Sequence, residues 1–156
     1  GGSNANNKYS WMRDMPMVTA QAIVNEMSKS IKVIHVRRDD QLALQNTTQF
    51  KGSLRELFVL IRESSKRLFI DSMCQHAAKA LNKSSVVCWV KNNPHVLGWD
   101  IHDNVKSDAL EEISTFDFSL LEPYNIEGDI LQCPYKEGTQ LFDLDEIMGC
   151  LTNQKK

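Results

Sequence analysis

Residues 67–90 contain, in close succession, a strand, a tight polar turn, a helix and a second strand. The apolar run 68–70 ends abruptly at Asp71 and Ser72, and a second apolar run covers 86–90. Between the two runs, residues repeat at the spacing of one apolar helix face: Ala77, Ala78 and Leu81. Two strands joined by a helix pair in parallel through a right-handed crossover, so this segment predicts an α/β fold.

The polar turn lies where such folds bind ligands. In open α/β sheets, ligands bind beyond the carboxyl ends of the strands. An acidic side chain such as Asp71 can reach sugar hydroxyls there, and free amides at the start of the next helix can hold phosphate. The turn 71–76 is therefore a candidate binding site.

Helices and apolar strands also alternate in the rest of the chain. The β-branched run 31–36 predicts a strand that is covered on both faces. Ser53 and Glu56 have the spacing of a capping box at the start of a helix over 54–62. This helix is expected to bury one stripe of side chains: Leu54, Leu57, Phe58 and Ile61.

Two more helices are predicted at about 17–28 and 143–152. The segment 98–104 is expected to be a loop with one short strand. Three further short elements are expected: a helical turn at 108–113, an ambiguous segment at 118–124 and an edge segment at 130–133. The alternation predicts a three-layer Rossmann-like sandwich with a mostly parallel sheet.

The length of 156 residues, of which 42% are hydrophobic, suits one domain. We place this domain at 11–156. Residues 1–10 open with seven small or polar residues, 1–7, which fits either a flexible lead or a glycine-rich loop entered from a strand that is absent. The fold therefore starts with a loop and a helix, and we expect it to lack its first strand or to be cut from a larger protein.

The charge and the cysteines exclude several classes of protein. The net charge is −2 and charges of both signs are interspersed, so the sequence shows no basic patch of the kind that binds nucleic acid. No run approaches the roughly 20 apolar residues of a transmembrane segment, and no signal peptide is evident. The four cysteines are widely spaced, which favours buried thiols over disulfides. We expect a cytoplasmic protein, with the inner face of the membrane as one possible location.

The turn 71–76 also carries a family pattern. An apolar strand, Asp-Ser, three residues, His, an alanine-rich helix and a Ser-Val-Val strand together resemble the donor half of family nine glycosyltransferases, the heptosyltransferase-like enzymes. Three other stretches are similar to that family in the same order: Trp11 with Pro16, the helix start 53–57, and Asn93-Pro94 with Gly98. The resemblance covers roughly residues 11–104.

The resemblance implies a two-domain B-type fold, of which this chain is the C-terminal half that binds the nucleotide-sugar. The acceptor site and the catalytic base lie in the N-terminal half, so no catalytic residue is expected here. Transfer in this family needs no metal, and we expect neither a metal nor a cofactor. The missing acceptor domain, the nucleotide-sugar and a cell-envelope glycan such as lipopolysaccharide are the implied partners.

Residue by residue, the resemblance implies a nucleotide-sugar site made of five residues. Asp71 matches the position that contacts the donor sugar, and the backbone of Ser72 matches the one that faces the diphosphate. Met73 departs from the family, which places glycine there so that phosphate can approach the amide. His76 matches the motif's histidine. Asp40, or its neighbour Asp39, falls near the position that meets the nucleoside.

Each of these residues also has a structural interpretation. Asp71 is a good helix cap, and His76 could pack and bond to a nearby backbone group. Trp89 is expected in the core, whereas Trp99 and His102 lie in a polar loop and are candidates for ligand or interface contacts. The cysteines and histidines fit no standard zinc pattern.

Two functions therefore remain open. The first is the donor-binding half of a glycosyltransferase, inactive without its N-terminal half. The second is a non-catalytic Rossmann-like module that binds a nucleotide or a protein. In the first case, the surface that faces the missing half is expected to expose apolar side chains and to promote self-association.

Overall fold

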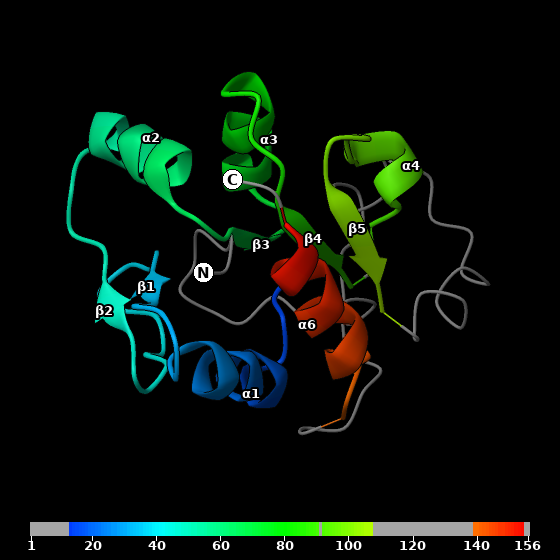
Figure 1. The fold of residues 1–156 in the computed structure, drawn as a ribbon, viewed down its shortest axis with the longest axis horizontal. Helices are drawn as coiled ribbons and strands as arrows, with labels where there is room; N and C mark the ends of the chain where they lie inside the picture. Colours follow the sequence, from blue (N-terminus) through cyan, green and yellow to red (C-terminus); the bar gives the residue numbers. More distant parts are fainter. Residues whose placement is uncertain (1–12, 91, 108–138, 155–156) are drawn as a thin grey trace, which may run out of the picture.

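The computed structural model describes residues 13–90, 92–107 and 139–154. In chain order, the elements are α1 (Met17–Met27), β1 (Ile34–His35), β2 (Thr48–Gln49), α2 (Leu54–Glu63), β3 (Leu68–Ile70), α3 (Met73–Ala80), β4 (Val86–Trp89), α4 (Pro94–Leu97), β5 (Asp103–Lys106) and α6 (Leu144–Asn153). Figure 1 shows their arrangement. The predicted elements at 108–113, 118–124 and 130–133 lie outside the described residues.

The strands form two parallel sheets. β3, β4 and β5 pair in that order, with Leu68 opposite Val86 and Cys88 opposite Val105. β1 and β2 pair separately, with Ile34 opposite Thr48. Parallel pairing with helices between strands confirms an α/β fold that is compatible with a Rossmann-like layout.

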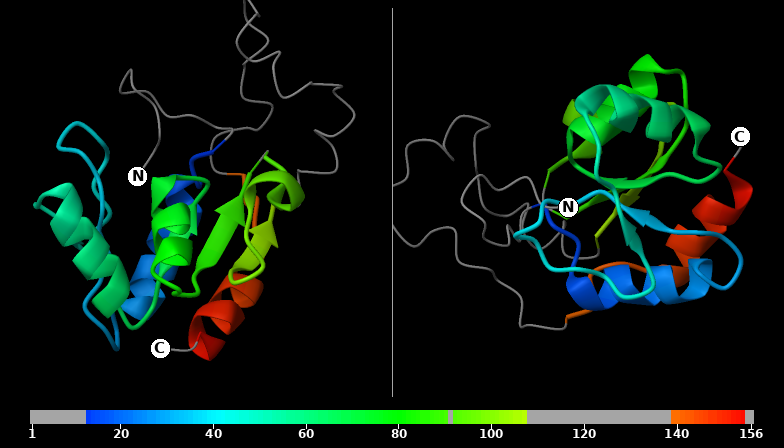
Figure 2. Two further views of the ribbon diagram at one scale, coloured as in Figure 1. Left: turned by 90° about the horizontal axis from the view of Figure 1, so that it is seen from above. Right: turned by 90° about the vertical axis from the view of Figure 1, so that its left-hand side faces the viewer.

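Helices cover both faces of the three-stranded sheet, as the right-hand view of Figure 2 shows. On one face, α1 and α6 pack over β4 and β5 through nine buried residues: Ile23, Val86, Cys88, Val90, Val105, Leu141, Phe142, Ile147 and Leu151. On the other face lies a smaller cluster from α2 and α3: Leu57, Ile61, Ala77 and Ala78. β4 is buried along its whole length because helices cover both of its sides.

Local chemistry explains the helix starts. Ser53 accepts a bond from the amide of Glu56, whose carboxylate accepts one from the amide of Ser53, so the predicted capping box is confirmed. Asp143 caps α6 by accepting from the amides of Asp145 and Glu146. The helices predicted at 17–28 and 143–152 are also confirmed, within one residue of each predicted boundary.

Two predictions are wrong in detail. β1 is shorter than 31–36. It is also not covered on both faces, because the side chain of Ile34 is 39% exposed. Leu54 is 56% exposed because the buried contacts of α2 with α3 begin only at Leu57. Residues 94–97 form the short helix α4, which Asn93 caps by accepting from the amide of His95.

Candidate functional site

The carboxyl end of β3 is the centre of the candidate site. Asp71 directly follows β3 and is only 5% exposed. Its carboxylate forms an ion pair with Arg13 (Nε to Oδ2, 3.3 Å) and accepts a hydrogen bond from the side-chain amide of Asn92. Because Arg13 precedes α1 and Asn92 follows β4, Asp71 joins three segments at this edge.

Asp71 does not cap the next helix. The N-cap of α3 is Ser72, and its side chain accepts no bond from the helix amides. The first turn of α3 therefore keeps amides that no side chain caps, and the helix dipole favours negative charge there. Met73, the first residue of α3, is 50% exposed beside this turn.

A cavity of about 870 Å³ opens at this edge. Three of the predicted site residues line it: Asp40, Ser72 and Met73. Arg13 and Arg38 also line it, so the mouth of the cavity has two guanidinium groups as well as the start of α3. We use the term cavity mouth for Arg13, Arg38, Asp40, Ser72 and Met73.

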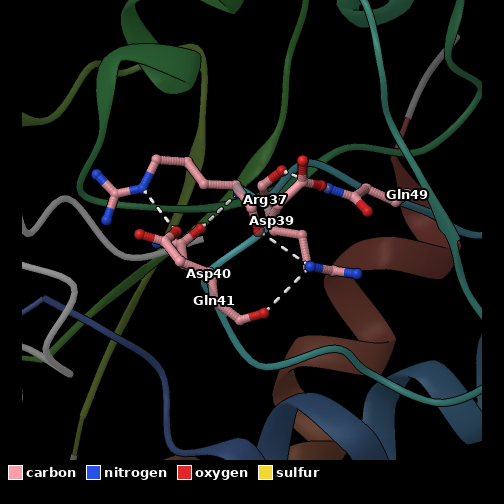
Figure 3. Close-up of polar contacts among 6 residues, drawn as sticks. Arg37, Asp39, Asp40, Gln41 and Gln49 are labelled. Carbon is pink, nitrogen blue, oxygen red and sulfur yellow. Dashed lines mark hydrogen bonds and ion pairs between the residues drawn. The ribbon is translucent and has the colours of Figure 1, made fainter.

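The loop after β1 brings Asp40 to this mouth, and its side chains hold it in shape (Figure 3). Arg37 donates to the backbone oxygens of Arg38 and Gln41, at 3.0 and 3.1 Å. Arg38 forms an ion pair with Asp40 (Nε to Oδ1, 3.2 Å). Asp39 turns toward β2, where a hydrogen bond from Gln49 at 2.8 Å lowers the pKa of its carboxyl. Of the two predicted aspartates, Asp40 is the one that lines the cavity.

His76 is not brought to the mouth. Its Nδ1 accepts a hydrogen bond from the indole of Trp99 at 2.9 Å, and Lys79 lies 5.7 Å from the centre of that indole ring. The predicted bond of His76 to a backbone group is thus replaced by one to a side chain. Trp99, which follows α4, is 42% exposed and forms a separate patch with His76 and Lys79 of α3, which we call the Trp99 patch.

His102 has a structural position. It is buried, its Nε2 donates to the backbone oxygen of Gln75 at 3.0 Å, and its Nδ1 then accepts from the hydroxyl of Ser85 at 3.0 Å. The ring therefore ties α3 to the start of β4. The expectation of a ligand contact at His102 is wrong because the side chain is buried and both of its ring nitrogens bond within the fold. Trp89 is fully buried, as predicted.

None of the three cysteines that the structure describes has a lowered thiol pKa. Cys74 lies in the first turn of α3, yet burial raises the pKa of its thiol. Burial also raises the pKa of Cys88, and no disulfide joins Cys74, Cys88 and Cys150. Within the described ranges, no three His, Cys, Asp or Glu side chains are grouped to hold a metal ion, and no helix is long and apolar enough to span a membrane.

Sequence reasoning missed Arg13 and Asn92. Asn92 could have been found, because it follows the strand next to β3 and parallel strands end at one edge of a sheet. Arg13 could not have been found in this way. It lies in a loop before a helix, and such a position does not show which strand end the side chain will contact. The nucleotide-sugar site itself stays a prediction. Of its five residues, Asp71 lies beside the cavity mouth and His76 lies away from it, and the other three are at the mouth: Asp40, Ser72 and Met73.

Comparisons with known proteins add no relative. No protein-family model matches the chain, and searches of curated proteins and of solved structures find no significant match either. The resemblance to family nine therefore depends on its motif residues alone.

Two histidines with lowered pKa values predict that acid weakens the fold. Burial lowers the pKa of His35 from 6.5 to about 4, and burial also lowers the pKa of His102. Below pH 6.5 the unfolded chain takes up protons that the folded protein does not bind. We expect the free energy of unfolding to fall as the pH drops from 6.5 to 4, by roughly 1–3 kcal/mol for His35.

Urea unfolding at several pH values measures this effect. His35→Gln should flatten the pH dependence, whereas His95→Gln, on the exposed face of α4, is the control and should leave it unchanged. An equally steep dependence in wild type and in His35→Gln would contradict the assignment.

Proposed function

We propose that this chain is the donor-binding half of a glycosyltransferase, which holds a nucleotide-diphosphate sugar at the cavity mouth. The observation that carries the proposal is the meeting of Arg13 and the uncapped first turn of α3 at the carboxyl end of β3. Both are suited to a diphosphate. A guanidinium can donate two parallel hydrogen bonds to phosphate oxygens, and the amides at the start of a helix favour negative charge.

The other parts of the ligand have matching positions. Asp71 lies within the same edge and would accept from hydroxyls of the donor sugar. Asp40, across the cavity mouth, would accept from the ribose hydroxyls. The charge of the diphosphate would be balanced by Arg13 and helix-start amides in place of a metal ion. The family resemblance supports this assignment, and it implies that transfer requires an N-terminal half that binds the acceptor.

Calorimetric titration of the chain with ADP, UDP and GDP tests the proposal. We expect one of the three to bind with a dissociation constant between about 10 μM and 1 mM, because half of the cleft is missing. We expect the chain alone to transfer no sugar. If none of the three nucleotides binds at millimolar concentration, the proposal is wrong.

The exposed side chain of Met73 favours the alternative, a non-catalytic module that binds a protein at this edge. A methionine in the first turn of α3 restricts the approach of phosphate, where glycine would allow it. Met73→Gly should therefore tighten nucleotide binding several-fold if the mouth holds a diphosphate. The control is Leu54→Gly, since Leu54 is also the exposed first residue of a helix and does not line the cavity. Unchanged affinity in Met73→Gly would favour the alternative.

A further inference from the structure

The two sheets face each other across the body of the cavity. β1 lines one side of the cavity and β3 lines the other, and the two strands do not pair. Figure 1 shows the pair β1–β2 set apart from β3, β4 and β5. A cavity of about 870 Å³ is far larger than the water-sized gaps of a packed interior, so among the described residues the two sheets leave room for a further element between them.

The backbone of β1 is open toward this gap. The carbonyl oxygens of Val33 and His35 accept from the amides of Thr48 and Phe50 on the β2 side, at 2.9 and 3.0 Å. Backbone groups of successive residues in a strand point to opposite edges, so those of Ile34 point away from β2. They point toward the cavity, which Ile34 lines.

The backbone of β3 is open in the same way. The carbonyl oxygen of Arg67 accepts from the amide of Val86 on β4 at 2.9 Å. By the same alternation, the backbone groups of Leu68 and Ile70 point away from β4, and both residues line the cavity. Among the described residues no strand pairs with either edge, so open strand edges border the gap on both sides.

The two edges run in the same direction. The ion pair of Arg13 with Asp71 fixes the chain before α1 at the carboxyl end of β3. α1 has 11 residues and extends for about 16 Å, and β1 begins only after α1 has ended. β1 thus starts at the opposite edge and runs parallel to β3.

The handedness of crossovers shows which segment belongs in the gap. β3, α3 and β4 form one crossover toward β5, with α3 on one face of the sheet. α1 packs with α6 on the opposite face. A right-handed crossover whose helix lies on that face advances across the sheet in the opposite direction, away from β5. The strand that α1 would connect to β1 therefore lies between β1 and β3.

We propose that the gap takes one extended β-strand, parallel to β1 and β3, which directly precedes residue 1 in the polypeptide and joins the two sheets into one. The first seven residues of the sequence are small or polar and are poor strand formers, so the strand is expected before them. The gap lies between apolar side chains of α1 and α2, among them Ile23, Val24 and Ile61. The strand is therefore apolar and β-branched on both faces.

An N-terminal extension of the chain tests this proposal. One version adds six residues rich in valine, isoleucine and threonine before residue 1, and the matched version adds six residues of serine, asparagine and glycine. We expect the apolar extension to slow amide hydrogen exchange of Ile34, Leu68 and Ile70 at least tenfold and to raise Tm. The polar extension should behave like the chain without an extension.

Three results would overturn the proposal. Exchange could be equally fast with both extensions, or these amides could already be protected without one, so that another part of the chain fills the gap. Protection could instead rise with protein concentration together with a dimer mass in light scattering, which would place a second copy there.

The variant Ile34→Pro tests whether the added strand lies beside β1. Ile34→Pro removes an amide that points to the gap and not to β2. It should abolish at least half of the gain in Tm from the apolar extension, whereas Ile34→Ala should retain it. If Ile34→Pro also destabilises the chain without an extension, exchange of Leu68 and Ile70 on the other side of the gap still decides the question. This test needs no nucleotide, so it is independent of the proposed function.

Discussion

Trp89→Ala is expected to lower the free energy of unfolding by about 3–5 kcal/mol. Trp89 is fully buried on β4, and its indole donates to the side chain of Asn104 on β5 at 2.8 Å. Removal of this ring leaves a cavity beside the central strand and an unpaired amide oxygen on its neighbour. Since the free energy of unfolding of small domains is only about 5–15 kcal/mol, this variant would lose a large part of its stability.

Urea unfolding followed by circular dichroism measures the loss. Trp89→Phe retains most of the packing and should cost about 1–3 kcal/mol, mainly through the unpaired Asn104. Trp99→Ala is the matched control, because Trp99 is 42% exposed and should cost no more than about 1 kcal/mol. If Trp89→Ala costs no more than Trp99→Ala, the order of strands described here is wrong.

Arg13→Ala is expected to weaken nucleotide binding at least tenfold. The variant removes one of the two guanidinium groups of the cavity mouth, the one that pairs with Asp71, and leaves the carboxylate of Asp71 with Asn92 as its partner. The freed negative charge then repels the diphosphate. The fold should lose about 1–3 kcal/mol, because solvent screens the half-exposed Arg13 but the carboxylate of Asp71 is left buried with Asn92 alone.

The opposite change provides the control for charge. Asp71→Asn frees Arg13 for phosphate and should tighten the binding of a nucleotide diphosphate that carries no sugar. The double variant Arg13→Ala with Asp71→Asn should bind more tightly than Arg13→Ala alone. Calorimetry of the four proteins measures the coupling between the two residues. Equal affinities in all four would mean that the diphosphate does not lie at this ion pair.

Much of the fold could be predicted from local patterns. The segment 67–90 became β3, α3 and β4 because its apolar runs and its polar turn all favour the same structure. The capping box at Ser53 depends on residues three apart, so the sequence alone shows it. β1 was predicted too long and too buried, because burial of its open edge depends on a neighbouring strand.

The candidate site was less predictable for a similar reason. Its residues come from loops that are distant in the sequence, and contacts between them depend on tertiary structure. Ser72 and Met73 were found because they follow a strand directly. Arg13 lies 58 positions before Asp71 in the chain, and the polarity of its loop gives no sign of that pairing. His102 looked exposed because its neighbours are polar, yet hydrogen bonds to Ser85 and Gln75 bury it.

The most direct test of the account is a map of amide chemical shifts during titration with ADP, UDP and GDP. Binding at the cavity mouth predicts that one nucleotide shifts the amides of Arg13, Ser72, Met73 and Cys74 most strongly. The Trp99 patch, with His76 and Lys79, should not respond. Strongest shifts at the Trp99 patch, or none anywhere at millimolar nucleotide, would contradict the claim that this edge of the sheet holds a nucleotide diphosphate.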